Sequence, residues 1–174
     1  MATRLAPEPP RRSAPFDQEP GFYPDAKLWL YGNVRLLGGP IAHFSGALGE
    51  PRQTPSQLDA LEPQAEALVL AGKILVTGIH NAAHQRVAVV PLRWGAPRIL
   101  VFSGGFYHHL GQKLTDEPFR AARLWRYQFD ARTDLVISRR APDRRPTFAL
   151  YNPTVDRLIE QIVGRQTPGL LFAN

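Results

Sequence analysis

Two short apolar runs on either side of a helix-like segment limit the fold of this chain more than any other feature of its sequence. The runs are KILVT, residues 73–77, and RILVF, residues 98–102. Each has the length of a strand, and the segment 81–94 between them is long enough for a helix. A strand, a helix and a second strand in this order form a parallel unit with a right-handed crossover. The sequence therefore predicts a parallel sheet with helices packed on it.

The same alternation continues on both sides of this unit. Further strands are expected at 27–31, 41–44, 134–138 and 169–173, and further helices at 54–72, 116–129 and 152–164. The segment 104–114 is expected to be a loop. The strands are nearly continuous apolar runs, which is typical of a sheet that is covered on both faces. These features predict an α/β fold, a Rossmann-like three-layer sandwich with a mainly parallel sheet of about five strands.

The helix predictions rest on residues that begin and end helices. In the helix 54–72, Thr54 is expected to be the N-cap, Pro55 to take the first position, Gln57 to complete a capping box and Gly72 to end the helix. Pro63 is expected to kink this helix or to split it in two.

Two other helices have comparable signals. In the last helix, Asn152 is the expected cap, Pro153 the first residue and Gly164 the end. Pro91 is expected to end or bend the helix that starts at 81, and Asp116 is a candidate cap for the helix 116–129.

Length and composition favour one domain of 21–174 that follows an extended, basic, proline-rich arm of 1–20. The chain has 174 residues, and five of its prolines lie within the first 20, together with Arg11 and Arg12. Proline removes backbone donors, and the segment has little apolar material to bury. There is no cysteine, which excludes disulfides and thiolate metal sites. No signal peptide and no apolar run of about 20 residues are found, so a cytoplasmic protein without a membrane partner is expected.

The chain is basic, with a formal net charge of +6 and a pI of about 10.2. A basic surface attracts anionic partners such as nucleic acid or nucleotides. Arginine strongly outnumbers lysine, however, and a solvated arginine-rich surface of a GC-rich coding sequence would have the same composition. Charge alone leaves both interpretations open.

Small polar residues and glycine follow several of the predicted strands. Ligands of open parallel sheets bind outside the carboxyl ends of the strands. Glycine lets the backbone approach a ligand closely, while hydroxyls, helix N-termini and arginines hold phosphate oxygens. The alternative is that the glycines only let the chain turn. The candidate nucleotide- or nucleic-acid-binding residues are Ser45, Gly46, Thr77, Gly78, His80, Asn81, Ser103, Gly104, Gly105, Arg139 and Arg140.

His80 and His84 share one face of a helix, which raises the question of a metal site. The chain has no cysteine and no HExxH motif, and no acidic ligand lies close to the pair in sequence. The spacing therefore favours helix-capping or core histidines, and neither a metal nor a cofactor is expected.

Aromatic residues alternate with arginines between 106 and 132. Such a pattern suits stacking on single-stranded bases, and it equally suits a helix packed on a sheet or a surface that binds a protein or a second copy of the chain.

The segments LYGNVRLL, VTGIHNAAHQ and RILVFSGG resemble, in order and spacing, the DNA-processing protein DprA (Smf) family of the Rossmann-like SLOG superfamily. The Gly-Asn step of that family resembles Gly32-Asn33, and its GSR step resembles Ser45-Gly46. Its SGxARGIDxxAH motif resembles residues 77–84, its Gly-Ser-Gly resembles residues 103–105, and its RNRxI segment resembles residues 150–159. The resemblance covers about 28–165 and implies binding of single-stranded DNA by a Rossmann-like domain.

The chain also departs from the family. No arginine follows Gly46, the ARG insert is missing, the aspartate of the motif is replaced by His80, and the RNR arginines are replaced by Tyr151 and Asn152. The PGGxGTxxE motif of the related LOG enzymes is absent, and Asp116, Glu117 and Asp130 have no predicted place near the strand ends.

Three hypotheses follow from these observations. The first is a minimal, diverged, non-enzymatic DprA-like protein that binds nucleotide or single-stranded nucleic acid. The second is a degenerate SLOG-type scaffold that acts as an interaction subunit of a larger, nucleoprotein-type complex. The third is a LOG-like nucleotide-processing enzyme.

Overall fold

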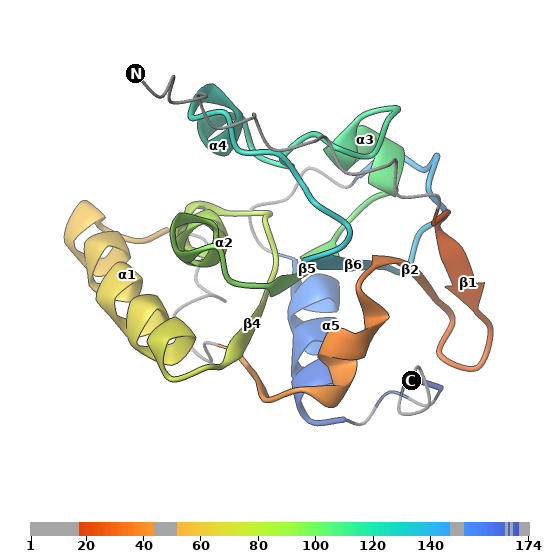
Figure 1. Cartoon of the computed structure of the whole chain (residues 1–174), viewed down its shortest axis with the longest axis horizontal. Coiled ribbons are helices and arrows are strands. Elements are labelled where there is room, and N and C mark those ends of the chain that lie inside the picture. Colours follow the sequence, from red (N-terminus) through yellow and green to blue (C-terminus); the bar gives the residue numbers. More distant parts are fainter. Residues whose placement is uncertain (1–17, 44–51, 147–151, 166, 168, 171–174) are drawn as a thin grey trace, which may run out of the picture.

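The computed structural model describes residues 18–43, 52–146, 152–165, 167 and 169–170. One sheet with the strand order β1-β2-β6-β5-β4-β3 forms its centre (Figure 1). Its strands are β1 (Gly21–Tyr23), β2 (Leu28–Gly32), β3 (Ile41–Ala42), β4 (Ile74–Thr77), β5 (Arg98–Phe102) and β6 (Leu135–Ser138).

The sheet is mainly parallel, as the sequence predicts. β3, β4, β5 and β6 run in the same direction, whereas β2 pairs antiparallel with β6 and β1 antiparallel with β2. The described residues form six strands, and β1 is an edge strand that the sequence analysis missed. The expected strand 169–173 lies mostly outside the described residues, and its first two residues, Gly169 and Leu170, form a turn.

Helices cover both faces of the sheet (Figure 1). One face carries α1 (Pro55–Leu70), α2 (Ala82–Trp94), α3 (Phe106–Leu110) and α4 (Arg120–Leu124), and the other carries α5 (Pro153–Val163) and the short 3-10 helix η1 (Val34–Gly38). The alternation along β5 shows how one strand serves both layers. Ile99 and Val101 pack with α5, while Leu100 and Phe102 pack with α2 and α3. This arrangement confirms the three-layer prediction.

The predicted N-caps of α1 and α5 form where the sequence places them. Thr54 Oγ1 accepts from the Gln57 amide at 3.2 Å and Gln57 Oε1 accepts from the Thr54 amide at 2.9 Å, which completes the capping box of α1. Pro63 does not split α1, which continues to Leu70. Pro91 likewise lies inside α2, which ends at Trp94 before a glycine in the left-handed conformation. Tertiary packing can outweigh the low helix propensity of proline. α1 and α2 pack on each other, and this contact stabilises both helices.

Two predictions between β5 and β6 are wrong. The expected loop 104–114 contains α3, because Phe106 and Leu110, one helical turn apart, are both fully buried. The expected helix 116–129 is reduced to α4. Asp116 does not cap it, since this residue forms an isolated bridge with Gln128. Glu117 is fully buried there, which a solvent-facing first turn would not allow.

Candidate functional site

The carboxyl ends of β4, β5 and β6 lie at one edge of the sheet because these strands are parallel. Phe102 pairs with Ser138, so Ser103 and Arg139 follow their strands at the same level. Thr77 pairs with Leu100 and ends the next strand along. The structure thus brings Thr77, Ser103, Arg139 and the residues after them to a common edge. Ser45 and Gly46 lie outside the described residues.

A small cavity opens at this edge between the ends of β5 and β6 and the start of α5. Its volume is about 100 Å³. Ser103, Arg139, Arg140, Asn152 and Thr154 supply its polar lining, and Phe102, Val155 and Leu158 its apolar lining. Two arginines, a serine, a threonine and an asparagine therefore line one small space. Arg139 Nη2 donates to Gln161 Oε1 in the last turn of α5 at 3.1 Å, which holds this guanidinium group beside that helix.

The N-terminus of α5 contributes to the polarity of this cavity. Asn152 Oδ1 accepts from the Val155 amide at 3.2 Å, and Pro153, which has no N–H, takes the first helical position. Thr154, the next residue, lines the cavity. The first amides of a helix carry the positive end of its dipole and favour anions.

The turn after β6, residues 138–146, is rich in arginine and is called the arginine turn below. Arg139, Arg140, Arg144 and Arg145 are all exposed. In the part of the chain that the structure describes, no carboxylate lies within ion-pair distance of Arg139, Arg144 or Arg145. Arg140 Nη1 donates to the Arg145 carbonyl at 2.7 Å and so ties the two ends of the turn together. The turn concentrates positive charge beside the cavity.

Gly104 and Gly105 pack against the arginine turn. A Cβ on Gly105 would lie 2.3 Å from the Pro142 carbonyl oxygen, and one on Gly104 would lie 2.5 Å from the Pro146 Cα. The Gly105 amide donates to the Arg144 carbonyl at 2.7 Å. These two glycines thus let the arginine turn approach the end of β5 closely, and they do not line the cavity.

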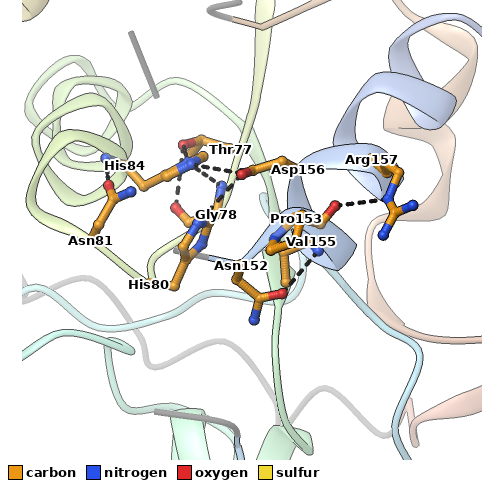
Figure 2. A network of polar contacts seen from close by, with 10 residues as sticks. All are labelled: Thr77, Gly78, His80, Asn81, His84, Asn152, Pro153, Val155, Asp156 and Arg157. Carbon is orange, nitrogen blue, oxygen red and sulfur yellow. Dashed lines mark hydrogen bonds and ion pairs between the residues drawn. The ribbon is translucent and has the colours of Figure 1, made fainter. Parts of the chain in front are cut away.

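Thr77, Gly78 and Asn81 form the junction between β4 and α2 (Figure 2). The Gly78 amide donates to His84 Nδ1 at 2.9 Å, and Thr77 Oγ1 lies 3.0 Å from the same nitrogen. Asn81 Oδ1 caps α2 by accepting from the His84 amide at 2.9 Å. These polar groups hold the buried His84 ring in place. This contact pattern agrees with the interpretation of His84 as a core histidine at a helix start.

Asp156 in the first turn of α5 reaches the two histidines from the opposite side of the sheet (Figure 2). Its Oδ1 lies 3.4 Å from His80 Nε2 and 3.3 Å from His84 Nε2. The two rings lie with their centroids 4.2 Å apart. Burial and, to a lesser extent, the neighbouring His84 lower the pKa of His80 to about 4, while Asp156 opposes the shift. His80 is therefore neutral at neutral pH.

Sequence reasoning missed Asp156 because only the fold brings α5 to the start of α2. The local signal was its place in the first turn after the Asn152 cap, a position that carboxylates often take in helices. The carboxylates considered from the sequence lie elsewhere. Glu117 forms a buried ion pair with Arg98 at the amino end of β5, and Asp130 accepts from the Arg132 amide at 2.9 Å in the turn before β6.

A second, larger hollow lies on the α2 and α4 face of the sheet. Its volume is about 610 Å³, and Phe119, Trp125 and Tyr127 line it together with Arg86 and Arg93. Among the aromatic residues of the segment 106–129, Phe106 and Phe129 are buried in the core, whereas Trp125 is 81% exposed. The aromatic and arginine alternation thus reflects core packing for some residues and an exposed aromatic surface for others.

Comparisons with known proteins identify the fold. No family model matches the chain, and no curated protein matches it. A solved structure that does match is DNA processing protein A of Helicobacter pylori, which was described for its mode of single-stranded DNA binding. The match has a TM-score of 0.51 and 18% sequence identity, and it covers 78% of this chain. The chain has a DprA-like fold. It spans 56% of the length of the H. pylori DprA chain, so it corresponds to just over half of that protein.

The DprA-like fold agrees with the resemblance that the sequence motifs indicate. Among the described residues of the chain, no helix is long and apolar enough to cross a membrane.

Proposed function

We propose that this chain is a non-enzymatic DprA-like protein that binds single-stranded nucleic acid or a nucleotide through phosphate at the carboxyl edge of its sheet. The observation that carries the proposal is the cavity in which Ser103, Arg139 and Arg140 meet the N-terminus of α5. The likeness to a protein described as binding single-stranded DNA supports the same ligand class.

The chemistry of the cavity suits a phosphate group. Planar guanidinium groups pair with phosphate oxygens through two parallel hydrogen bonds, and the amides at a helix start add further donors. A cavity of about 100 Å³ admits one small anionic group rather than a whole nucleotide. The sugar and base of the ligand would then lie outside the cavity, where Arg144 and Arg145 are exposed to bind neighbouring phosphates.

This proposal narrows the set of candidate binding residues. Ser103, Arg139 and Arg140 contact the ligand, and Thr154 joins them. Thr77, Gly78, Asn81, Gly104 and Gly105 support the edge through the internal contacts described above. We further propose that 21–174 is a single domain preceded by the basic arm of 1–20, which agrees with the start of β1 at Gly21.

Fluorescence anisotropy of a labelled oligo-dT, titrated with the full chain at several salt concentrations, tests the proposal. Binding is expected at low salt and should weaken as salt rises, because each phosphate contact releases a counterion. The double variant Arg139→Gln with Arg140→Gln should show a weaker salt dependence. The negative slope of log affinity against log salt should become shallower by roughly 0.7 for each phosphate that the variant no longer neutralises. Arg132→Gln is the matched control, since Arg132 is exposed at the opposite edge of the sheet.

Three outcomes would count against phosphate binding at this edge. They are undetectable affinity at low salt, affinity that does not depend on salt, and equal effects of the control and the double variant. A nucleotide used as competitor distinguishes the two ligand classes, since a mononucleotide site is blocked by nucleoside monophosphate and an extended strand site is hardly affected.

A second candidate function, that of an interaction subunit, is favoured by the exposed apolar residues beside the larger hollow. Leu124 is 74% and Trp125 is 81% exposed. Under this hypothesis, Leu124→Ser with Trp125→Ser disperses an assembly seen in analytical ultracentrifugation and leaves oligonucleotide affinity unchanged. Unaltered sedimentation of the variant would exclude that surface. The enzymatic alternative is tested by incubation with nucleoside monophosphates, for which we expect no release of base.

A further inference from the structure

We propose that His80, His84 and Asp156 bind one divalent metal ion of the zinc class between the β4–α2 junction and the start of α5. Sequence reasoning found no acidic ligand near the two histidines, and the fold supplies one from a distant segment (Figure 2). One ligand atom from each of the three residues lies within 4.8 Å of the other two.

The distances from Asp156 to the two histidines are those of metal ligands. Zinc bonds to histidine nitrogen and carboxylate oxygen are about 2.0–2.1 Å long, so two ligands of a tetrahedral site lie roughly 3.3 Å apart. Asp156 Oδ1 lies 3.4 Å from His80 Nε2 and 3.3 Å from His84 Nε2. Charge-assisted hydrogen bonds between nitrogen and carboxylate are usually shorter, about 2.7–2.9 Å. Neither Nε2 atom forms a hydrogen bond with Asp156 or with any other described group.

The burial of the histidines points the same way. The side chains of His80 and His84 are only 4% and 1% exposed, and both ring nitrogens of His80 lack a hydrogen-bond partner among the described residues. A buried polar atom without a partner costs about 1–3 kcal/mol, so such groups need a ligand or another function to explain them.

A supporting group for the metal-bound form of His84 is present. A metal ligand bound through Nε2 carries its proton on Nδ1 and donates it to a nearby acceptor. Thr77 Oγ1 lies 3.0 Å from Nδ1 and donates its own proton to the Gly78 carbonyl at 3.2 Å, which leaves its oxygen lone pairs to accept.

The Gly78 amide distinguishes the two states of His84. It donates to Nδ1 at 2.9 Å, which places the ring proton on Nε2 when no metal is bound. Metal binding therefore displaces the Nε2 proton, moves the protonated position to Nδ1 and turns the Gly78 amide away. The change at this amide is a specific signature of the proposed site.

The ligand set also indicates which metal is bound and how. Two imidazoles and one carboxylate suit zinc and its neighbours in the first transition series better than magnesium or calcium, which prefer oxygen ligands alone. Three protein ligands leave a fourth position for water or an anion. Asp156 has the most exposed side chain of the three ligands, with 22% accessible, so that position is reached from its side.

Isothermal titration of the chelator-treated full chain with zinc chloride tests the proposal. We expect one equivalent to bind, and bound cobalt should give the intense visible absorption of a four-coordinate ion. His80→Gln and Asp156→Asn should each weaken zinc binding by about tenfold or more. His108→Gln is the matched control, since His108 is exposed and lies outside the cluster, and it should bind zinc like the parent chain.

Nuclear magnetic resonance provides the second readout and does not depend on the variants folding equally well. Zinc should move the Gly78 amide resonance and shift the protonated position of the His84 ring from Nε2 to Nδ1. The proposal is overturned if zinc does not bind saturably, if His80→Gln and Asp156→Asn bind as tightly as His108→Gln, or if the Gly78 amide resonance stays in place. These results are independent of oligonucleotide binding, so either proposal can fail without the other.

Discussion

Replacement of Arg98 by methionine should destabilise the fold more than any surface change of the same kind. Arg98 is completely buried at the start of β5. Its Nε donates to Asp134 Oδ2 at 2.9 Å, its Nη1 donates to the Ala88 carbonyl at 3.0 Å, and its Nη2 contacts Glu117. One guanidinium group thus joins α2, the residue before β6 and the segment before α4.

The size of the effect follows from the charges that remain. Burial raises the pKa of both Glu117 and Asp134, and Arg98 is the cation that opposes this shift. Without Arg98 the two carboxylates are buried with no compensating charge. Breaking a buried pair in this way costs about 3–5 kcal/mol. Since domains are stable by roughly 5–15 kcal/mol, the change removes a large part of the free energy of unfolding.

Urea unfolding followed by circular dichroism measures the effect. Arg93→Met is the matched control, because the Arg93 side chain is 50% exposed and pairs with the partly exposed Glu62. An exposed pair of this kind contributes less than about 1 kcal/mol. Adding Glu117→Gln to Arg98→Met should recover part of the stability, since it removes one uncompensated charge. If Arg98→Met and Arg93→Met lower the unfolding free energy equally, the buried cluster does not stabilise the fold as argued.

Three further changes test other parts of the structure. The raised pKa of Glu117 means that the folded chain holds this proton more tightly than the unfolded chain, so stability falls as pH rises through the folded-state pKa. Glu117→Gln should flatten that part of the curve of urea midpoint against pH, and an unchanged curve would contradict the assignment. Thr54→Ala removes one half of the capping box and should cost about 1 kcal/mol in urea unfolding; no change would show that the cap is dispensable. Gly105→Ala places a Cβ 2.3 Å from the Pro142 carbonyl, so thermal unfolding should shift to lower temperature, and a stability equal to that of the parent chain would show that the arginine turn moves freely.

The local elements of the fold are predictable because their signals lie within a few residues. Capping residues such as Thr54 and Asn152 accept hydrogen bonds from the first helix amides. The apolar runs of β4 and β5 can be buried on both sides only in a sheet that is covered on both faces. The segment between β5 and β6 is less predictable. Its conformation depends on Glu117 reaching Arg98, a contact that no local pattern encodes.

In the candidate site, too, some features follow from local signals and others depend on contacts between distant segments. The parallel order predicts that Ser103 and Arg139 share an edge, since strand direction alone decides it. The sequence analysis predicts that Gly104 and Gly105 face a ligand. The arginine turn packs against them instead, a contact that the sequence around them does not indicate. Asp156 lies beside the histidines only because α5 packs on the other face of the sheet with its first turn close to the start of α2, a placement that depends on the whole fold.

The two outer strands of the sheet are short. β1 has three residues, and β3, as far as the structure describes it, has two. Few unpaired backbone amides and carbonyls are therefore available for another chain to extend the sheet, a route by which many β-rich proteins aggregate. Pairing of another chain with the described residues of β1 and β3 is therefore disfavoured.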